Sequence, residues 1–557
     1  MFKTALLVVT KPLSQLRAHI PEYLTQINSL VSKTAYVHIH PFDLPVSKAE
    51  LLTAPYSKEV RNIIKDFYTT SSKTCSNIDV RVLVGHLTND GKAIEKYTFR
   101  EPCDVVLIDR KIVDDKVSDF VKSLQPNFSL TSDVSFKTVE DNAANDDEPD
   151  SKRKRPNTPE DAKPLKQYSH TVVGGTYDRL HVGHKLLLSE ACALATEKLT
   201  VGVTTGPMLN SKVLNELIQP TDTRIDIVKQ FLQEVKPSLE YSMYAITDGF
   251  GPTVPAESND DMKDSSTMEL IVLSQETVKG GEMINAERKK MGLNELEVYK
   301  IDLLEDSCHS QYEEEKVSSS SLRKRLLGTL FHPVQVKPNI PTRPYILGLT
   351  GGIASGKSSV CKRLEGQGAR IVDCDKLGHR AYVKGTPGFD KIVDAFGSGI
   401  VGDDGEVNRR ALGTIVFGNK EELNKLNQLV WPEIARLAQE QIQQYTKDGA
   451  AVVVLDAAVL LEAGWDDMCH EVWTTLVPRQ EAIKRLVDRN KMSEDAAAKR
   501  LDSQISNSDR VARAHVILCT LWEYEYTQKQ VETAWKLLTE RLPVSHEGNT
   551  TVAKSNI

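Results

Sequence analysis

Two glycine-rich segments of this 557-residue chain carry residues suited to phosphate chemistry. Residues 174–184 read Gly-Gly-Thr-Tyr-Asp-Arg-Leu-His-Val-Gly-His, which places His181 and His184 three positions apart. Residues 351–358 read Gly-Gly-Ile-Ala-Ser-Gly-Lys-Ser. The first pattern indicates nucleotidyl transfer and the second indicates phosphoryl transfer. We therefore expect two consecutive reactions, in which the product of the first site is the substrate of the second.

The first segment is predicted to lie on a turn between a strand and a helix. Residues 171–173 are a short apolar run, and residues 186–194 have the apolar spacing of a helix. Glycines in such a turn let the backbone approach a phosphate, and the amides at the helix start point at it. His181 and His184 then lie on one side of the first helical turn, where two imidazoles can stabilise a triphosphate.

A serine run at residues 317–323, Val-Ser-Ser-Ser-Ser-Leu-Arg, follows about one domain length later. It is predicted to open a helix, because serine hydroxyls cap helix N-termini. The hydroxyls and the first amides of that helix can also hold β- and γ-phosphates. Alone, the run would be only a helix cap, but together with the two histidines it predicts a nucleotide site.

The second glycine-rich segment has the context that a phosphate-binding loop requires. Residues 345–349 are predicted as a buried strand and residues 358–364 as a helix. The loop amides cradle the phosphates, Lys357 offsets their charge, and Ser358 can ligate Mg²⁺. The residues predicted to bind ATP in this loop are Gly351, Gly352, Ile353, Ala354, Ser355, Gly356, Lys357, Ser358 and Ser359.

Residues after this loop indicate a phosphate acceptor and a lid. Residues 370–375 are predicted as a strand that ends in two acids, so that Asp375 can take a hydroxyl proton. Residues 452–455 are another apolar strand, and residues 485–500 are a basic helical stretch. The acids can equally start a surface loop and the basic stretch can be a solvated helix face, so both alternatives stay open here.

The histidine and serine segments together resemble the nucleotidyltransferase superfamily, which is marked by (H/T)xGH and ISSTxIR motifs. Residues 248–253 (Asp-Gly-Phe-Gly-Pro-Thr) and 274–281 (Ser-Gln-Glu-Thr-Val-Lys-Gly-Gly) are similar to its phosphopantetheine adenylyltransferase branch of eukaryotic and archaeal type. Gly249 replaces a proline of that branch. The resemblance covers residues 168–330 and implies adenylyl transfer from ATP to 4′-phosphopantetheine, with Mg²⁺ on the triphosphate.

This resemblance also implies roles for individual residues. The catalytic pair is His181 and His184, and Thr176 contacts the transferred phosphate together with His184. The implied ATP site comprises Gly174, Gly175, Thr176, His181, His184, Ser318, Ser319, Ser320 and Arg323. The implied 4′-phosphopantetheine site comprises Thr176, Lys212, Arg224 and Lys279.

Residues 345–545 resemble dephospho-CoA kinase in the phosphate-binding loop, in the acid pair followed by Leu-Gly-His, and in residues 409–412 and 456–462. The resemblance implies that Lys357 and Asp375 are catalytic, with Asp375 as the base on the ribose 3′-hydroxyl. It makes Arg489 part of a lid over ATP. The implied dephospho-CoA site comprises Asp375, His379, Arg485 and Arg510. Departures from the family pattern, in the acceptor pocket and the lid, are Trp431, Ala458 and Asn490.

In this order the two segments resemble bifunctional coenzyme A synthases. The implied products are dephospho-CoA and pyrophosphate at the first site, then coenzyme A and ADP at the second, with ATP as co-substrate of both. One alternative is a cytidylyltransferase or nicotinamide-mononucleotide adenylyltransferase fused to another small-molecule P-loop kinase. The other is a regulatory protein whose P-loop switches on nucleotide binding.

The chain is predicted to be α/β, with a Rossmann-like nucleotidyltransferase domain, a P-loop kinase domain and an additional N-terminal α/β domain. That N-terminal domain lacks a glycine-rich turn, so we favour interaction over catalysis. Its role stays open between a degenerate catalytic relative, a membrane or organelle attachment module and a protein-docking unit. The predicted segments are residues 1–137 (N-terminal domain), 138–167 (charged disordered linker), 168–330 (adenylyltransferase), 331–344 (connector), 345–545 (kinase) and 546–557 (tail).

Composition excludes several other classes of function. The net charge of -7, from 77 acids and 70 bases, offers no basic field, so nucleic acid is not an expected partner. The longest apolar run, residues 450–461, is shorter than the roughly 18 residues of a membrane span. Eight scattered cysteines favour a reduced compartment. We expect a cytoplasmic protein, with association with mitochondria as the alternative. The basic run at residues 152–155 is expected to be solvated, with a nuclear-import signal as the alternative.

Overall fold

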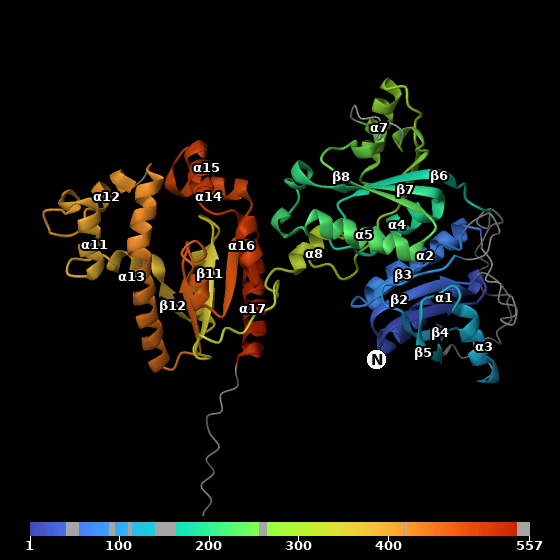
Figure 1. Cartoon of the computed structure of the whole chain (residues 1–557), viewed down its shortest axis with the longest axis horizontal. Coiled ribbons are helices and arrows are strands. Elements are labelled where there is room, and N and C mark those ends of the chain that lie inside the picture. The colour runs from blue at the N-terminus through green and yellow to red at the C-terminus, as the bar shows by residue number, and fades with distance from the viewer. Residues whose placement is uncertain are drawn as a thin grey trace, which may run out of the picture. The chain divides into compact units, whose positions relative to one another are not determined.

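The computed structural model describes residues 1–40, 55–87, 95–109, 114–139, 163–255, 264–416 and 418–542. These residues form three five-stranded sheets in which the paired strands run parallel (Figure 1). The chain divides into two compact units, Met1–Leu322 with two of the sheets and Arg323–Ile557 with the third. The α/β fold class predicted from the sequence is confirmed.

The first sheet belongs to the N-terminal domain and has the strand order β3-β2-β1-β4-β5. Alternation along β1 sends Ala5 and Leu7 to the face covered by α1 and α2, and Leu6 and Val8 to the face covered by α3. Both faces are apolar, as expected for a parallel sheet with helices on each side. The elements are β1 Phe2–Val9, α1 Leu13–Leu30, β2 Val31–Ile39, α2 Lys58–Thr74, β3 Asp79–Val82, β4 Cys103–Ile108, α3 Asp114–Leu124 and β5 Leu130–Thr138.

The second sheet has the strand order β10-β9-β6-β7-β8. If the five strands of this sheet are numbered one to five along the chain, their order across the sheet, starting at β8, is 3-2-1-4-5. The N-terminal sheet has the same order. The two domains therefore share one topology. The elements are β6 Tyr168–Gly175, α4 Val182–Leu194, β7 Ala195–Thr204, α5 Thr221–Val235, β8 Glu240–Ile246, β9 Leu270–Ser274, α7 Val278–Lys290, β10 Glu297–Ile301 and α8 Ser319–Arg325.

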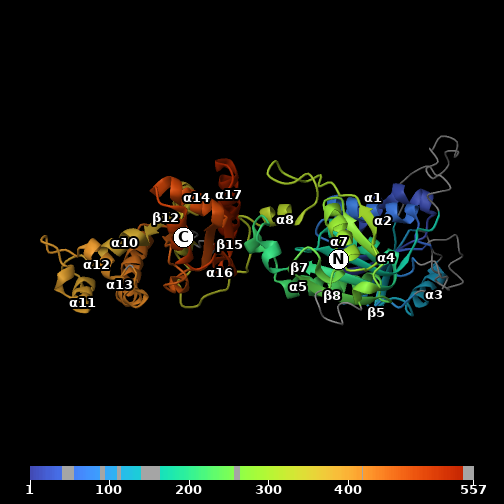
Figure 2. The ribbon, with the colours of Figure 1, turned by 90° about the horizontal axis from the view of Figure 1, so that it is seen from above.

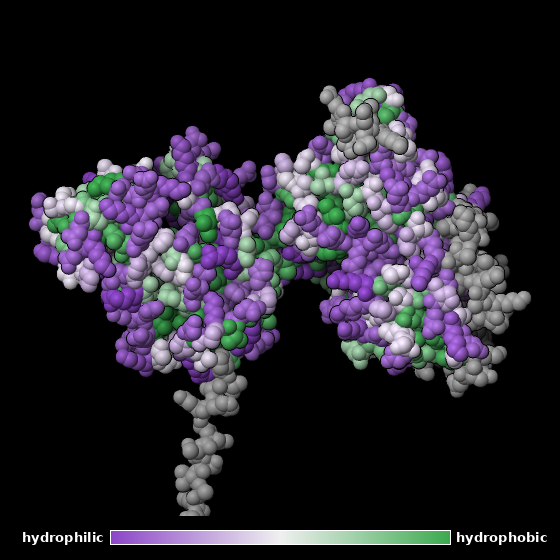
Figure 3. All heavy atoms as spheres, viewed as in Figure 1, coloured by the Kyte–Doolittle hydropathy of each residue, from purple (hydrophilic) through white to green (hydrophobic). Residues whose placement is uncertain are grey.

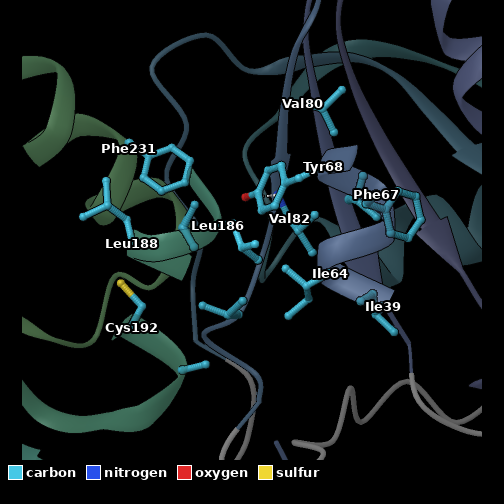
Figure 4. Close-up of a cluster of buried hydrophobic side chains, with 14 of the residues drawn as sticks. Ile39, Ile64, Phe67, Tyr68, Val80, Val82, Leu186, Leu188, Cys192 and Phe231 are labelled. Atoms are coloured by element: carbon cyan, nitrogen blue, oxygen red, sulfur yellow. Dashed lines mark hydrogen bonds between the residues drawn. The ribbon is translucent and has the colours of Figure 1, made fainter. Parts of the chain in front are cut away.

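These two domains share a hydrophobic core within the first unit, although the sequence predicted them as separate segments. Figure 4 shows Ile64 and Phe67 of α2 in the same cluster as Leu186 and Cys192 of α4. The core then continues on to β6, β7 and β9. The linker and tail predictions fall mainly on residues 140–162 and 543–557, which lie outside the described residues.

The third sheet belongs to the second unit and has the order β12-β13-β11-β14-β15. β11 directs Leu347 and Leu349 to a core shared with α9 and α17, and Ile346 to one shared with α10 and α13. Figure 2 shows α11 and α12 beside α13, away from α17. The elements are β11 Tyr345–Gly351, α9 Lys357–Gly366, β12 Arg370–Asp373, α10 Cys374–Arg380, α11 Pro387–Phe396, α12 Arg409–Val416, α13 Lys420–Lys447, β13 Val452–Asp456, β14 Glu471–Leu476, α14 Arg479–Asn490, α15 Glu494–Asp502, α16 Asn507–Arg513, β15 Val516–Cys519 and α17 Tyr524–Arg541.

Hydrophilic side chains predominate on the face drawn in Figure 3, with smaller hydrophobic areas between them. Within the described residues, no helix combines the length and the apolar character needed to cross a membrane. Residues 331–344, predicted as a connector, contain neither helix nor strand. The eight cysteines are free thiols, and Cys308 is the exposed one.

Candidate active sites

The first candidate site lies on the turn between β6 and α4, as the sequence predicted. The turn is tightly folded, since Tyr177 and Arg179 adopt φ angles of 52° and 51°. The Tyr177 ring is buried against the turn, and a Cβ atom on Gly175 would lie 2.9 Å from that ring. Gly175 is therefore required by the packing of Tyr177 as well as by close approach of a phosphate.

The turn brings the two predicted histidines into direct contact. Their rings stack with centroids 3.7 Å apart and an interplanar angle of 18°. His181 caps α4, because its Nδ1 accepts the His184 amide at 3.4 Å. A Cβ atom on Gly183 would lie 3.2 Å from the His181 ring, so the glycine between the histidines leaves room for that ring.

His184 is electrically neutral near pH 7. Burial lowers the pKa of His184 to about 4, against a smaller opposing effect of the Asp178 charge. Its Nδ1 is buried and has no hydrogen-bond partner. A neutral imidazole still has one N–H to donate and one nitrogen to accept. His184 is thus suited to bind a phosphate oxygen as a hydrogen-bond donor.

The serine run meets the turn through one hydrogen bond. The Ser319 hydroxyl, in the first turn of α8, donates to the Asp178 carbonyl at 2.8 Å. Ser318 accepts the Ser321 amide at 3.1 Å, which is the helix cap that the sequence predicted. The Asp178 side chain is fully buried and pairs with Arg179 at 2.8 Å. Two motifs that lie 141 residues apart in sequence therefore meet in one site.

Arg224 was expected to line the acceptor and triphosphate sites, and the structure places it against the backbone of the turn that carries Thr176. Its side chain is fully buried, and Nη1 donates to the carbonyls of Thr176 at 2.7 Å and Thr204 at 2.9 Å. Nε donates to the Gln219 carbonyl at 2.8 Å. Arg224 holds the turn in place, because its donors are used by backbone carbonyls that would otherwise be unsatisfied. Thr176 also accepts the Thr204 hydroxyl, at 3.0 Å.

Lysines surround the serine run, and the sequence analysis missed one of them. Lys316 is half-buried, and burial followed by the nearby charge of Lys212 lowers its pKa. Lys316 pairs with Glu276 and with Glu314, the latter at 3.2 Å. Like charges held together favour a bound anion, so Lys316 joins the predicted Lys212. Its position directly before the serine run was the available signal.

The remaining predicted residues of this site are placed as follows. Lys279 is exposed in the first turn of α7, within the segment that resembled the acceptor-binding motif. Arg323 is buried on α8. Ser320 is half-buried beside Ser319.

The second candidate site lies between β11 and α9, where the loop has the backbone that a phosphate cradle needs. Ala354 and Gly356 adopt φ angles of 62° and 87°. A Cβ atom on Gly351 would collide with the Thr475 hydroxyl, which itself contacts the Ser355 hydroxyl at 2.6 Å. The Ile353 amide donates to the Gln504 side chain at 2.8 Å. These contacts hold the loop open for an anion.

Lys357 is placed between two carboxylates. It forms an ion pair with Asp456 at the end of β13, and its Nζ lies 3.8 Å from Oδ2 of Asp375. Burial alone would lower the pKa of Lys357, but the Asp456 charge raises it above the ordinary value. The lysine is therefore fully charged and available for phosphates. Asp456 received no role in the sequence analysis, although it ends a predicted strand.

Asp375 was predicted at the end of a strand, but β12 ends at Asp373 and Asp375 lies in the first turn of α10. The Asp373 side chain caps that helix by accepting the Lys376 amide at 3.0 Å, which ends the strand early. Partial desolvation raises the pKa of Asp375, the Lys357 charge opposes this, and the Asp456 charge adds to it. A carboxylate of raised pKa is a better proton acceptor. His379 lies one helical turn later and is exposed.

Two of the arginines assigned to dephospho-CoA differ in their contacts. Arg485 donates to the Ala354 carbonyl at 3.2 Å and to the Thr520 carbonyl at 2.6 Å, so it supports the loop itself. Arg510 is buried, and its Nη1 would lie 3.4 Å from a Cβ atom on Gly352. The Nε and Nη2 atoms of Arg510 have no hydrogen-bond partner, and Nη2 lies 4.0 Å from the Glu462 carboxylate. A buried guanidinium with unused donors is suited to bind an anionic ligand.

The predicted basic helix at residues 485–500 is two helices. α14 ends at Asn490, Lys491 adopts a φ angle of 54°, and α15 begins at Glu494. Arg489 is exposed at the end of α14, where it donates to the Asn490 side chain at 2.9 Å. The break places the predicted lid arginine at a helix end, where a change of backbone angles is least costly.

The chemistry of the donor groups fits Mg²⁺ at this second site. Ser358 is exposed in the first turn of α9, and its hydroxyl is an oxygen donor of the kind Mg²⁺ prefers. Among the described residues, no group of three or more histidine, cysteine or acidic side chains can hold a metal by itself. Nucleotide oxygens and water would therefore supply the other ligands.

Comparison with known proteins matches each part of the chain separately. Three family models match: COASY N-terminal domain over residues 3–133, cytidylyltransferase-like over residues 172–325, and dephospho-CoA kinase over residues 345–520. The curated dephospho-CoA kinase of Carboxydothermus hydrogenoformans is 38% identical over 194 residues, which cover 34% of this chain and 94% of that protein. That of Symbiobacterium thermophilum is 39% identical over 191 residues, covering 34% and 80%. The solved structure of TT1252 from Thermus thermophilus is 29% identical with a TM-score of 0.31, covering 36% and 99%.

Proposed function

The chain belongs to the dephospho-CoA kinase family and has the domain composition of bifunctional coenzyme A synthases, and from this premise we propose that it catalyses two consecutive reactions. In the first, an adenylyl group passes from ATP to 4′-phosphopantetheine, giving dephospho-CoA and pyrophosphate. In the second, ATP phosphorylates the ribose 3′-hydroxyl of dephospho-CoA, giving coenzyme A and ADP.

In the first reaction the substrates supply both the nucleophile and the leaving group. An oxygen of the acceptor phosphate attacks the α-phosphorus in line, and the bond to the β-phosphate oxygen breaks to release pyrophosphate. His184 donates a hydrogen bond to the transferred phosphate, and Lys212 with Lys316 offsets the negative charge. The serine run holds the departing pyrophosphate. Catalysis then consists of positioning and charge stabilisation.

The observation that supports this reaction most directly is the hydrogen bond from Ser319 to the Asp178 carbonyl. It brings the serine run beside the histidine turn, so that one triphosphate can contact both. A helix cap with no nucleotide role would not need to meet the histidine turn.

In the second reaction, Asp375 accepts the proton of the 3′-hydroxyl while the oxygen of that group bonds to the γ-phosphorus. The bond from that phosphorus to the β–γ bridging oxygen breaks, and ADP leaves. Lys357 is 3.8 Å from Asp375 and, once phosphates compete with Asp456, binds the β- and γ-phosphate oxygens. Arg510 offers its unused donors to the anionic acceptor. Ser358 would hold Mg²⁺, whose charge offsets that of the triphosphate.

The test is mass spectrometry of the products formed from 4′-phosphopantetheine, ATP and Mg²⁺ by the full chain. Wild type is expected to give coenzyme A, His184→Ala no adenylylated product, and Lys357→Ala accumulated dephospho-CoA. One parallel assay replaces ATP by CTP. A second keeps ATP and replaces the acceptor by nicotinamide mononucleotide. Product from those substrates, and none from 4′-phosphopantetheine, would favour the other nucleotidyltransferases and reject this proposal.

A further inference from the structure

The N-terminal domain has the topology of the catalytic domain but a different turn after its first strand. At the end of β1, the Thr10 amide donates to the Asp109 carboxylate at 2.9 Å and the Lys11 amide does so at 3.0 Å. The Thr10 hydroxyl adds a third bond at 2.7 Å. Asp109 follows β4, so a carboxylate of the chain itself takes up the amides of this turn. The domain thus keeps the fold without a phosphate site at this turn.

What the N-terminal domain does contact is α4, the helix that begins with the histidine turn. Every side chain of α4 from Lys185 to Leu194 is buried. A helix on the surface of a domain normally leaves one face to solvent. Here α2 covers that face, and Figure 4 shows Ile64 and Tyr68 of α2 directed towards Leu186 of α4.

Polar contacts fix α4 to the N-terminal domain along the same face. Lys185, the residue after His184, forms an ion pair with Asp79 and donates to the Val80 carbonyl at 3.3 Å. One turn later, the Ser189 hydroxyl contacts the Tyr68 hydroxyl at 2.9 Å. Arg61 binds both carboxylate oxygens of Glu190, at 3.0 and 3.1 Å. The helix is therefore held at its start and its middle.

Among these contacts, the ion pair between Asp79 and Lys185 involves the residue next to His184, and further hydrogen bonds support it. Asp79 also accepts two hydrogen bonds from Arg81, at 2.6 and 2.9 Å, and Arg81 pairs with Glu234 of α5. Burial would raise the pKa of Asp79, but the charges of Lys185 and Arg81 lower it. The Lys185 side chain is only 9% exposed, so loss of the Asp79 charge would leave a buried cation short of its partner.

We propose that the N-terminal domain is a non-catalytic copy of the nucleotidyltransferase fold that positions α4, with Asp79 as a positioning residue that acts on His184 through Lys185. The inference rests on the proposed adenylyl transfer for its kinetic consequence. Asp79 does not touch the reacting groups. It fixes the first turn of α4, on which the alignment of His184 with the transferred phosphate depends.

The test compares Asp79→Asn with wild type in the full chain. A shift of about half an ångström at His184 lowers kcat for adenylyl transfer about tenfold, since a 1 Å misplacement costs about a hundredfold. The KM for ATP changes less than twofold. Release of α4 also exposes His184 to water, so its pKa, followed by histidine-selective NMR, rises from about 4 towards the ordinary value. Asp79→Glu restores most of the rate.

The controls are internal to the chain. Phosphorylation of added dephospho-CoA is expected to be unchanged, which shows that the second unit is intact. Asp66→Asn also removes one negative charge from the N-terminal domain, but Asp66 lies on α2 and pairs with Arg17 at 2.5 Å on the surface. This variant is expected to leave adenylyl transfer unchanged. If Asp79→Asn does not fold, Arg61→Gln tests the contact between α2 and Glu190 of α4. It is also expected to lower kcat for adenylyl transfer.

The outcomes separate the two proposals. Wild type that forms no dephospho-CoA refutes the proposed function, and the NMR measurement then still decides the role of Asp79. Wild-type kcat together with an unchanged His184 pKa in Asp79→Asn overturns the positioning role. An equal loss of adenylyl transfer in Asp66→Asn also overturns it, because the effect would then be a general one of the domain.

Discussion

Substitution of the glycine between the two histidines separates activity from stability. Gly183 lies in the first turn of α4, and a Cβ atom there would be 3.2 Å from Cε1 and Nδ1 of His181. Carbon contacts are ordinarily no closer than about 3.5 Å, so Gly183→Ala pushes the imidazole away by about 0.3 Å or slightly more. The ring already stacks on His184 with centroids 3.7 Å apart, so the shift is passed on to that residue.

The expected result is a threefold to tenfold lower kcat for adenylyl transfer, scaled from about a hundredfold per ångström of misplacement. The free energy of unfolding is expected to rise or stay unchanged, because alanine in a helix is favoured over glycine by about 0.5–1 kcal/mol. Loss of activity therefore cannot be ascribed to unfolding. Gly366→Ala, at the end of α9 with no atom within 4 Å of its added Cβ, is the control.

The assay is the steady-state rate of dephospho-CoA formation with saturating ATP and 4′-phosphopantetheine, alongside thermal melting of both variants. The control is expected to match wild type in this rate. Gly183→Ala with a wild-type rate would show that the position of His181 is not critical. A lowered melting temperature would show that the ring cannot move aside.

Three further predictions concern the rest of the chain. Asp375→Asn lowers kinase turnover by about 10²- to 10⁴-fold through loss of the base, with dephospho-CoA accumulating in the product assay; full turnover would reject that role. Asp456→Asn leaves the Lys357 ammonium, whose side chain is only 12% exposed, without its charged partner. The free energy of unfolding of the kinase unit then falls by about 3 kcal/mol in denaturant titrations, and an unchanged unfolding midpoint would contradict this. Burial lowers the pKa of His86 to about 3 and that of His38 well below its ordinary value, so the unfolded chain binds more protons. The contribution of these histidines to the stability of the first unit is therefore complete above the ordinary histidine pKa of about 6.5 and declines as pH falls towards about 3. Urea melts that do not change over this range would contradict this prediction.

Local sequence was sufficient to predict the strands and helices that flank both glycine-rich turns. The strands predicted at residues 171–173, 345–349 and 452–455 correspond to β6, β11 and β13. Apolar runs bounded by turn residues specify such strands without help from the rest of the chain. The α/β class and the places of the two glycine-rich turns follow from the same local signals.

Local signals failed where a neighbouring side chain decides the outcome. Asp373 caps α10, so the strand ends before Asp375, and Lys491 in the left-handed region divides the predicted basic helix. Each break depends on one residue. The periodicity of apolar residues over a long segment does not reveal where such a residue ends a helix or a strand.

The roles of basic residues were decided by the tertiary structure. Sequence identified Arg224 and Arg485 as ligand-binding residues, yet both donate to backbone carbonyls of the turns that they were expected to serve. A guanidinium has five donors, and only the surrounding structure determines whether protein carbonyls or a ligand accept from them. The same holds for Asp456, which is a partner of Lys357 only because β13 lies beside β11.

The sequence by itself determined which chemistry the chain carries, because glycine turns, a histidine pair and a serine cap are local patterns with local physical causes. The tertiary structure decided which of these patterns meet and what supports them. Ser319 reaches Asp178 across 141 residues, and the N-terminal domain covers α4 through contacts from β3 and α2. Contacts between distant segments depend on packing and buried charge, which no short stretch of sequence contains.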